Sequence, residues 1–512
     1  MTSLILLILS LVPLLDLASP GLPITHDGQD HVARIASFYQ SLSEGNIIPR
    51  WAGNLNWGYG HPILMFLYPL PSYAASLFHF IGFSFVDSTK LVFAAAYIAS
   101  IFSMYLWSKS QWGERAGFVA ALLYGFAPYR FVDLYVRGAI GEHVAFIFPP
   151  LILWSLYKKK TIVGALSVAG LMLSHNAVSL MFAPIIALYI LYLNRSYLRL
   201  LVAVALGLFL SAFFWIPALF EGKYTLRDIV TNEDFASRFV NFSQFFYTPG
   251  NELSKEIGIV QVLLIVAAIF LFFKLKKRRL LAGILIVLVV SVFLMLPVSQ
   301  PIWQNVTILQ KFQFPWRFLH IVVFLTAALG GFVMSKIPPK RQIHVAILIT
   351  VGALITTYSM WSAKYYRQYP ESFFTSVYAG TTDTGESSPI WSVRFMEHEP
   401  QAPVGVIEGN AQVELGGRST TRREYKVTAQ NRSRLLENTL YFPGWKVSVD
   451  GQQVPVEFQD PTHRGLMTFI VDAGTHNISI QFTRTKMRLF SELLSLAGLM
   501  LLAGVVIYNR KL

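Results

Sequence analysis

Cysteine is absent from all 512 residues, and only 14% of the residues are charged, against about 25% in a typical soluble protein. The lack of cysteine excludes disulfides, iron–sulfur clusters and zinc sites with thiolate ligands. Hydrophobic residues make up 54% of the chain, which is more than one soluble core can bury. The composition therefore predicts a mainly α, polytopic membrane protein of the cell envelope.

Several motifs of soluble enzymes are also missing. The chain has no Walker loop, no GxGxxG after a strand and no HExxH. The formal net charge is +14, but the basic residues form short clusters between apolar runs. This distribution is typical of topology signals and not of a nucleic-acid surface, so we expect no nucleic-acid partner.

Apolar runs separated by short loops fill most of residues 1–361, and one more lies near the C-terminus. Their number predicts about 12 transmembrane helices. The runs lie at about residues 3–19, 88–107, 116–128, 140–157, 161–174, 176–194, 198–216, 256–273, 280–297, 317–335, 341–361 and 488–508.

Every second connection between these runs holds a basic cluster. The clusters are Lys109 with Arg115, Lys158 to Lys160, Arg195 with Arg199, Lys274 to Arg279, Lys336 with Lys340 and Arg341, and Arg510 with Lys511. The positive-inside rule places these connections in the cytoplasm and the others outside. The predicted protein is thus a multi-pass protein of the plasma membrane, surrounded by membrane lipids, and residues 20–87 form its first external loop.

Two apolar stretches do not follow the regular pattern. Leu4 to Leu15 is short and lacks a basic start, so it is a short span, a signal-like segment or a span with a misplaced start. His61 to Gly82 contains three prolines, and counting it as a span would export the loop of Lys109. We interpret it as an interfacial helix, with an ordinary kinked span as the alternative.

Residues 362–487 are polar and rich in turn signals. Lys446 to Gly451 and Gln453 to Phe458 predict a hairpin on an Asp-Gly turn, and Leu466 to Val471 and Asn477 to Phe482 also alternate as strands do. We expect a small extracytoplasmic β-sandwich here. It would follow a transmembrane module of residues 1–361 and precede a final span and tail at 488–512. Glycan binding, bracing of the loops and purely structural support are all open roles.

An acidic motif follows the first apolar run. Asp27 and Asp30 stand beside His26, His31 and Arg34, at the start of an amphipathic segment that predicts a helix over 30–42. Carboxylates three residues apart share a helical face, where they perform acid/base chemistry or hold a divalent cation such as Mg or Mn. Capping of the helix by Asp27 is the structural alternative.

A second group of ionisable residues lies at the next external boundary. Arg130 and Arg137 are suited to gripping a phosphate, with membrane snorkelling as the alternative. Glu142 and His143 begin the next span, which favours an ion or proton role.

Two more external boundaries each hold one such residue. His175 interrupts a long apolar stretch, either as a ligand or as a hydrogen-bonded connector. Arg317 lies in Phe314-Pro315-Trp316-Arg317-Phe318. Its outward position favours an anionic partner, because it departs from the positive-inside trend.

These motifs together resemble a known superfamily. The acidic motif after the first span, the proline-rich segment from Gly58 to Pro71 and the Arg/Glu pair at the third external boundary resemble GT-C membrane glycosyltransferases. Tyr135 to Glu142, Ser174 to Asn176 and Phe314 to Phe318 resemble the group of membrane proteins labelled "6-pyruvoyl-tetrahydropterin synthase-related", a label that implies no pterin chemistry. Phe442 to Gly451 with Ala473 to His476 resemble the β domain of YfhO-type proteins.

The resemblance implies an inverting glycosyltransferase with a polyprenyl-phosphate-linked sugar donor. The acceptor would be a cell-envelope glycan, lipid or protein on the outer face. Asp27 or Asp30 would be the base, although the family often has its two acids closer together. Substrate contacts are expected from His31, Arg34, His61, Arg130, Arg137, His175 and Arg317, and metal ligands from Asp27, Glu142 and His143.

Two other functions remain open at this point. A transporter or flippase of a lipid-linked or anionic substrate would need ionisable groups near mid-bilayer and often shows internal repeats, and no repeat is evident. A non-catalytic protein of envelope-glycan assembly would depend mainly on the β-sandwich.

Overall fold

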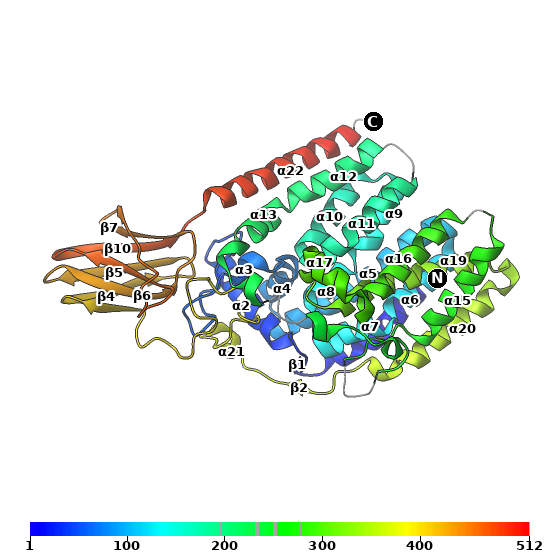
Figure 1. The fold of residues 1–512 in the computed structure, drawn as a ribbon, viewed down its shortest axis with the longest axis horizontal. Helices are drawn as coiled ribbons and strands as arrows, with labels where there is room; N and C mark the ends of the chain where they lie inside the picture. The colour runs from blue at the N-terminus through cyan, green and yellow to red at the C-terminus, as the bar shows by residue number, and fades with distance from the viewer. Residues whose placement is uncertain (194–196, 231–234, 249–252, 277, 511–512) are drawn as a thin grey trace.

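Helices form one end of the molecule and strands the other. The computed structural model describes residues 1–193, 197–230, 235–248, 253–276 and 278–510. Arg195, Lys277 and Lys511 of the predicted basic clusters lie outside the described residues. In Figure 1 the β domain lies at one end of the long axis, and the two chain termini lie among the helices away from it.

Six helical segments of the described residues are long and apolar enough to cross a membrane. They are α5 (Phe85–Trp112), α8 and α9 (Ile140–Ala145 and Phe148–Lys158), α11 (Asn176–Leu193), η7 and α19 (Pro315–Phe318 and Leu319–Lys336), α20 and η8 (Pro339–Thr357 and Tyr358–Met360), and α22 (Lys486–Arg510).

Two bent pairs raise the number of candidate spans in the described chain to eight if each pair is one span. The pairs are α12 with α13 (Tyr197–Leu210 and Ala212–Phe220), bent by 69°, and α16 with η6 and α17 (Arg279–Met295, Pro297–Ser299 and Gln300–Asn305), bent by 88°. Leu296 precedes a proline, which disfavours helical backbone at the second bend.

The other apolar runs fold as helices shorter than the roughly 20 residues of a perpendicular span. By length and composition, the described helices thus give fewer candidate spans than the 12 expected. The expected number of 12 stays a prediction. The short apolar helices are α1 with η1 (Thr2–Leu11 and Val12–Ala18), α6 (Glu114–Gly125), α10 (Thr161–Ser174) and α15 (Ile259–Lys274).

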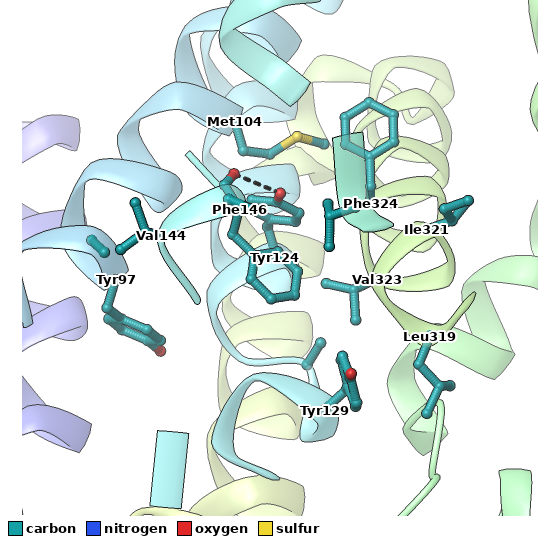
Figure 2. Close-up of a cluster of buried hydrophobic side chains, with 14 of the residues drawn as sticks. Tyr97, Met104, Tyr124, Tyr129, Val144, Phe146, Leu319, Ile321, Val323 and Phe324 are labelled. Atoms are coloured by element: carbon teal, nitrogen blue, oxygen red, sulfur yellow. Dashed lines mark hydrogen bonds between the residues drawn. The ribbon is translucent and has the colours of Figure 1, made fainter. Parts of the chain in front are cut away.

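The centre of the helical part is a tightly packed group of α5, α6, α8 and α19. A Cβ atom at Gly330 would lie 2.1 Å from the Leu123 side chain, so this glycine lets α19 approach α6 closely. Figure 2 shows the aromatic core, in which the Tyr124 hydroxyl donates a 2.8 Å hydrogen bond to the Phe146 carbonyl. This packing makes a firm base for the ionisable residues around Glu142.

The first loop contains short helices, as the sequence predicts. Helix α2 (Gly28–Ser43) buries the expected apolar face, including Val32 and Ile35. The proline-rich run from His61 to Gly82 is divided into α3 (Ile63–Phe66) and α4 (Leu70–Phe80). Neither helix is long enough to cross a membrane, so this run is not a straight span.

The remaining elements of the helical part are short. They are β1 (Leu22–Pro23), α7 (Pro128–Phe131), η2 (Val132–Arg137), η3 (Gly222–Tyr224), α14 (Arg227–Val230), η4 (Phe235–Arg238), η5 (Phe242–Phe245), α18 (Thr307–Gln310), β2 (Tyr366–Arg367) and α21 (Ser372–Thr375).

The predicted β-sandwich is confirmed. Its five-stranded sheet has the order β4-β5-β10-β7-β8 and its three-stranded sheet the order β3-β6-β9. Asp450 and Gly451 both have positive φ, as the predicted Asp-Gly hairpin turn requires. The strands are β3 (Val404–Glu408), β4 (Ala411–Arg418), β5 (Arg422–Ala429), β6 (Ser433–Leu440), β7 (Trp445–Val449), β8 (Gln452–Val454), β9 (Leu466–Val471) and β10 (Gly474–Phe482).

The β-sandwich is joined to the first loop by a shared apolar core. Trp51 of the loop packs edge-on against Trp445 of β7, with ring centroids 5.3 Å apart. The strands begin only at Val404. Residues 365–380 bind the first loop by backbone hydrogen bonds, whereas the carbonyl of Pro403 already accepts from the N–H of Asn438 in β6. The expected sandwich boundary at residue 362 therefore includes a segment that belongs structurally to the helical part.

Candidate active site

The first turn of α2 presents two half-buried carboxylates. Asp27 occupies the N-cap position, but its side chain makes no capping hydrogen bond, and the N–H of Gly28 donates to Oγ1 of Thr25 instead. Within the described part of the chain, the Asp27 carboxylate has no hydrogen-bond or ion-pair partner. It is therefore available to a ligand, and the capping alternative is not what the structure shows.

Asp30 is held by a chain of polar side chains. The Tyr378 hydroxyl donates a 2.9 Å hydrogen bond to Oδ1 of Asp30 and accepts one of 3.0 Å from Nε2 of Gln29. Burial raises the pKa of the Asp30 carboxyl, and the nearby Asp27 raises it further, against the lowering effects of Arg34 and Tyr378. A carboxylate with a raised pKa is a better proton acceptor than an ordinary surface aspartate.

Arg34 lies one turn further along α2 and is 8% exposed. Its Nη1 donates a 3.0 Å hydrogen bond to Nδ1 of His31, and its Nε donates one of 3.1 Å to Oγ1 of Thr382. Burial and the cation of Arg34 hold the pKa of His31 well below its usual value, so the imidazole is neutral and accepts this bond. Among the described residues no carboxylate forms an ion pair with Arg34, which leaves its charge for an anion.

A second cluster surrounds Glu142 at the start of α8. Oε2 of Glu142 accepts hydrogen bonds from Nη1 of Arg137 at 2.8 Å and from the Tyr129 hydroxyl at 2.9 Å. Oε1 accepts one from Nε of Arg317 at 2.7 Å. Arg137 also pairs with Asp133 at 2.8 Å. The cluster thus holds two guanidinium groups and two carboxylates in a buried network.

The two groups of residues are joined through the backbone. The N–H groups of His26 and Asp27 donate to the carbonyls of Val136 and Arg137 at 3.0 and 2.9 Å. Gly138 has a φ of +65°, and a Cβ atom there would lie 2.2 Å from Oγ1 of Thr25. The π-helical turn η2, a feature frequent at functional sites, therefore fixes the start of α2 against the Glu142 cluster.

Tyr68 lies at the boundary between these groups. Its ring is 5.0 Å from the ring of His175, and Nε2 of His175 is 3.8 Å from Oε1 of Glu142. A Cβ atom at Gly141 would lie 2.1 Å from the Tyr68 ring, so this glycine makes room for it. Gly141 therefore leaves space for the Tyr68 ring, and His175 lies between that ring and the Glu142 carboxylate.

A narrow pocket of about 10 Å³, enough for about one water molecule, lies between α2 and the proline-rich run. Its polar lining comes from His31, Arg34, Tyr68 and Ser72, and its apolar lining from Ile35, Phe38, Leu64, Leu67, Pro69, Pro71 and Ile140. The lining presents a cation at one wall and hydrocarbon at the others, which suits an anionic head on an apolar chain, but α2 and the proline-rich run must separate before such a ligand can enter.

The segment after α20 closes the site on its other side. The carboxylate of Asp383 accepts hydrogen bonds from the N–H groups of Gly385 and Ser387 at 2.9 and 3.0 Å. Burial alone would raise the pKa of Asp383, but the nearby His61 and these hydrogen bonds together lower it. Asp383 is thus an ionised carboxylate that shapes a loop, and Thr382 beside it holds Arg34.

Comparison with known proteins now gives a family. Residues 64–366, more than half of the chain, match the family described as "6-pyruvoyl-tetrahydropterin synthase related domain; membrane protein". The chain belongs to this family. The family assignment and the long apolar helices together establish a multi-pass membrane protein.

One relative of this family member is an uncharacterized protein of Lactococcus lactis subsp. cremoris. It is 30% identical over 241 residues, which cover 42% of the present chain and 39% of the Lactococcus protein. The match therefore spans well under half of that relative.

Three solved structures that resemble this family member come from different organisms, and all have TM-scores below 0.5. They are the arabinofuranosyltransferase AftD from Mycobacteria (TM-score 0.46, 17% identity, covering 70% of this chain and 26% of that one), the Archaeoglobus fulgidus oligosaccharyltransferase (0.42, 15%, covering 75% and 56%) and ArnT from Cupriavidus metallidurans bound to undecaprenyl phosphate (0.34, 13%, covering 72% and 67%).

Most of the sequence-predicted residues of this family member meet at the site. Asp27, Asp30, His31 and Arg34 lie together on α2, and Arg137, His175 and Arg317 gather around Glu142. His61 is fully buried and its Nε2 is 3.3 Å from the hydroxyl of Ser388, so it supports the closing segment and does not face the pocket between α2 and the proline-rich run.

Arg130 and His143 are placed differently from expectation. Arg130 is 0% exposed, lies 3.9 Å over the Phe146 ring and donates to Ser100, because aromatic side chains of the core surround it. His143 is 0% exposed and lies 3.8 Å from Asp133. Neither residue lines the pocket of Arg34, so the phosphate contact expected of Arg130 stays a prediction.

The expected metal ligands are not brought together either. The described residues contain no group of three His, Asp or Glu side chains arranged to hold a metal ion. Glu142 is occupied by Arg137 and Arg317, and His143 lies on the core side of the cluster. The set of Asp27, Glu142 and His143 therefore does not fit a divalent cation.

Sequence reasoning missed Tyr68, Tyr378, Thr382 and Asp383. Three of them lie in the segment that was expected to be part of the sandwich. The run from Thr381 to Glu386, with two acids and three threonines in six residues, was a usable signal, because such a polar run stands out in a chain with few charges.

Proposed function

We infer that this protein is a membrane glycosyltransferase that moves a sugar from a polyprenyl-phosphate donor to an acceptor of the cell envelope on the outer face. The observation that carries this proposal is the arrangement on α2. Two carboxylates, one of them without a partner among the described residues, precede an arginine without an ion-pair partner in a pocket with apolar walls. The resemblance to GT-C enzymes in the same motifs supports it.

Once the pocket widens, the donor would lie with its phosphate against Arg34 and its prenyl chain along the apolar wall. Arg34 is suited to this role because guanidinium groups bind phosphate bidentately, and Thr382 and His31 fix its orientation. Tyr68 lines the same pocket and would contact the donor beside the phosphate.

The reaction would be a single displacement with inversion. The acceptor hydroxyl oxygen bonds to the anomeric carbon while the bond from that carbon to the phosphate oxygen breaks. The hydroxyl proton passes to Asp27 or Asp30, and the bonding electrons leave with the polyprenyl phosphate. Arg34 stabilises the negative charge that develops on this phosphate.

The Glu142 cluster would position the site and not react. Glu142 pairs with Arg137 and Arg317, Asp133 pairs with Arg137, and Glu142 accepts from Tyr129, so all of these groups already have partners. Because the backbone of Arg137 binds the N–H of Asp27, the cluster sets the position of the base. No step of the proposed reaction runs through a metal ion.

A profile of lipid carriers and envelope glycans tests the proposal. In cells that lack this chain, we expect a polyprenyl-phosphate sugar to accumulate and one envelope glycan to lose that sugar. The native chain restores both, and an Arg34→Gln variant does not. Lys364→Gln, an exposed site away from the pocket, is the matched control. Unchanged donor and glycan profiles in cells lacking the chain would reject the proposal.

A transporter of a lipid-linked or anionic substrate is the second candidate, and one observation favours it. Arg130, His143 and His320 are each 0% exposed, and each has side-chain nitrogens without a hydrogen-bond partner in the described structure. Unpaired polar groups inside a helical bundle are typical of ion and substrate pathways. Flux of a polyprenyl-phosphate sugar across proteoliposomes, unaffected by Asp27→Asn and Asp30→Asn, would favour this candidate over the transferase.

A further inference from the structure

A second polar pocket lies between the first loop and the β-sandwich, outside the site described above. It has a volume of about 550 Å³, which is within the range of about 300–1,000 Å³ that is usual for ligand pockets. The first loop contributes Gln40, Asn54 and Trp57, the segment after α21 contributes Ser376 and Val377, and the sandwich side contributes residues 399–403 and 418–420 with Arg423.

The backbone at the pocket wall is strained. Asn56 and Trp57 are consecutive non-glycine residues with φ of +54° and +58°, a conformation that side chains disfavour and that clusters at binding sites. It is maintained by hydrogen bonds from the N–H of Asn56 to the Gly380 carbonyl at 2.9 Å and from the N–H of Trp57 to the Tyr378 carbonyl at 3.0 Å. The strain fixes the half-buried Trp57 indole at the pocket wall.

Polar side chains at the rim are free to bind. Among the described residues, no hydrogen-bond partner is present for the exposed side chains of Gln40, Glu399 and Gln401. Asn54 below them is already fixed, since its Oδ1 accepts from Ser37 at 2.6 Å and its Nδ2 donates to the Ser376 carbonyl at 3.0 Å. The pocket therefore combines one rigid aromatic wall with amides and a carboxylate at its mouth.

This lining fits a carbohydrate better than a phosphate or a lipid. A sugar ring offers a face of C–H groups that packs on an indole, and its hydroxyls pair with amide and carboxylate groups. A phosphate would meet the free carboxylate of Glu399. Nη1 of Arg418, a cation of the lining, is already bound to Tyr425 and Glu437 at 3.2 and 3.4 Å.

We propose that this pocket binds an oligosaccharide segment of the acceptor. The proposal rests on the transferase function inferred above and adds the class of acceptor, a glycan held between the first loop and the β-sandwich. Val377 lines the pocket, and the next residue, Tyr378, donates to Asp30. A chain bound along Trp57 therefore lies on the other side of the segment that orients the acidic pair.

Binding to the full chain in lipid nanodiscs tests this proposal without any transfer reaction. The probes are defined neutral hexasaccharides and oligosaccharides released from the envelope of the cells that naturally contain this chain. A peptide of similar mass serves as the comparison ligand. Saturation-transfer NMR and calorimetry are expected to show that at least one oligosaccharide binds the native chain. Its affinity should be at least tenfold weaker for Trp57→Ala and at least threefold weaker for Gln401→Ala.

Matched controls are Gln412→Ala and Gln453→Ala, which change exposed glutamines elsewhere on the sandwich and should bind as the native chain does. Gln401 is exposed and unpartnered in the described structure, so its variant keeps the test valid if Trp57→Ala does not fold. Asp27→Asn should retain binding even if it abolishes transfer, which separates this pocket from the proposed reaction. Three results would overturn the proposal: no oligosaccharide binds, both pocket variants bind as tightly as the native chain, or the peptide binds more tightly than the oligosaccharides.

Discussion

The hydroxyl of Tyr378 donates a 2.9 Å hydrogen bond to the carboxylate of Asp30, across 348 positions of sequence. From the same segment, Oγ1 of Thr382 accepts a 3.1 Å hydrogen bond from Nε of Arg34. The chain between α20 and the β-sandwich is thus a wall of the site and not a linker. It orients the residues of α2 on one side and lines the pocket of Trp57 on the other.

The first prediction concerns pH. The hydrogen bond from Tyr378 lowers the pKa of Asp30, against the raising effect of burial. A base works only when deprotonated, so transfer should fall as pH drops through this pKa. Tyr378→Phe removes the bond, and the acid limb of the rate profile should move to higher pH. Tyr365→Phe, which changes an exposed tyrosine, should leave it in place. A limb that does not move in Tyr378→Phe would indicate that Asp30 is not the base.

The second prediction concerns the stability of the Glu142 cluster. Glu142→Gln leaves the buried cations of Arg137 and Arg317 without their shared carboxylate. Removing one partner of a buried ion network costs about 3–5 kcal/mol. The unfolding temperature in detergent should therefore fall clearly, and it should hardly change in Glu114→Gln, which breaks an exposed pair with Lys109. Equal unfolding temperatures for the two variants would contradict this account.

The third prediction uses a glycine at the site. Gly141→Ala would bring a Cβ atom to 2.1 Å from the Tyr68 ring and 2.7 Å from the Ser174 carbonyl, so Tyr68 must move. We expect transfer to fall at least tenfold while the protein still inserts and purifies. Gly283→Ala in α16 is the control, because nothing lies within 4 Å of a Cβ atom there. Full activity of Gly141→Ala would show that the position of Tyr68 is not needed.

The fourth prediction concerns orientation in the membrane. Because the chain has no cysteine, each introduced cysteine reports one position alone. Ile47→Cys, at a side chain that is 78% exposed in the first loop, and Gln453→Cys in the sandwich should react with a membrane-impermeant maleimide on intact cells. Lys340→Cys should react only after permeabilisation. The opposite pattern would place the site in the cytoplasm and remove the lipid-linked donor from the outer face.

The sequence predicted the parts of the fold that local pattern controls. Period-3.6 apolar residues predicted α2, and the Asp450-Gly451 turn predicted the hairpin of β7 and β8. The number of spans was less predictable. Thr161–Ser174 folds as the helix that its apolar run predicts, but its 14 residues are fewer than the roughly 20 of a perpendicular span, so counting apolar runs does not count spans.

The site was predictable where ionisable residues interrupt apolar sequence. Asp27, Arg34 and Glu142 were found for that reason. Arg130 carries the same local signal, yet it is caged by aromatic side chains, because neighbours brought by α5 and α8 decide where its guanidinium lies. Tyr378 could not be found locally, since its role comes from a contact with a helix at the other end of the chain.

The most direct test of the central claim is the transfer rate of the purified protein with a polyprenyl-phosphate sugar, compared for the native chain, Asp27→Asn and Asp30→Asn. Both variants keep the size of the side chain and should fold and insert normally. The account predicts that at least one of them loses about 10²–10⁴-fold in rate, the usual contribution of a general base. Native rates in both single variants would contradict it.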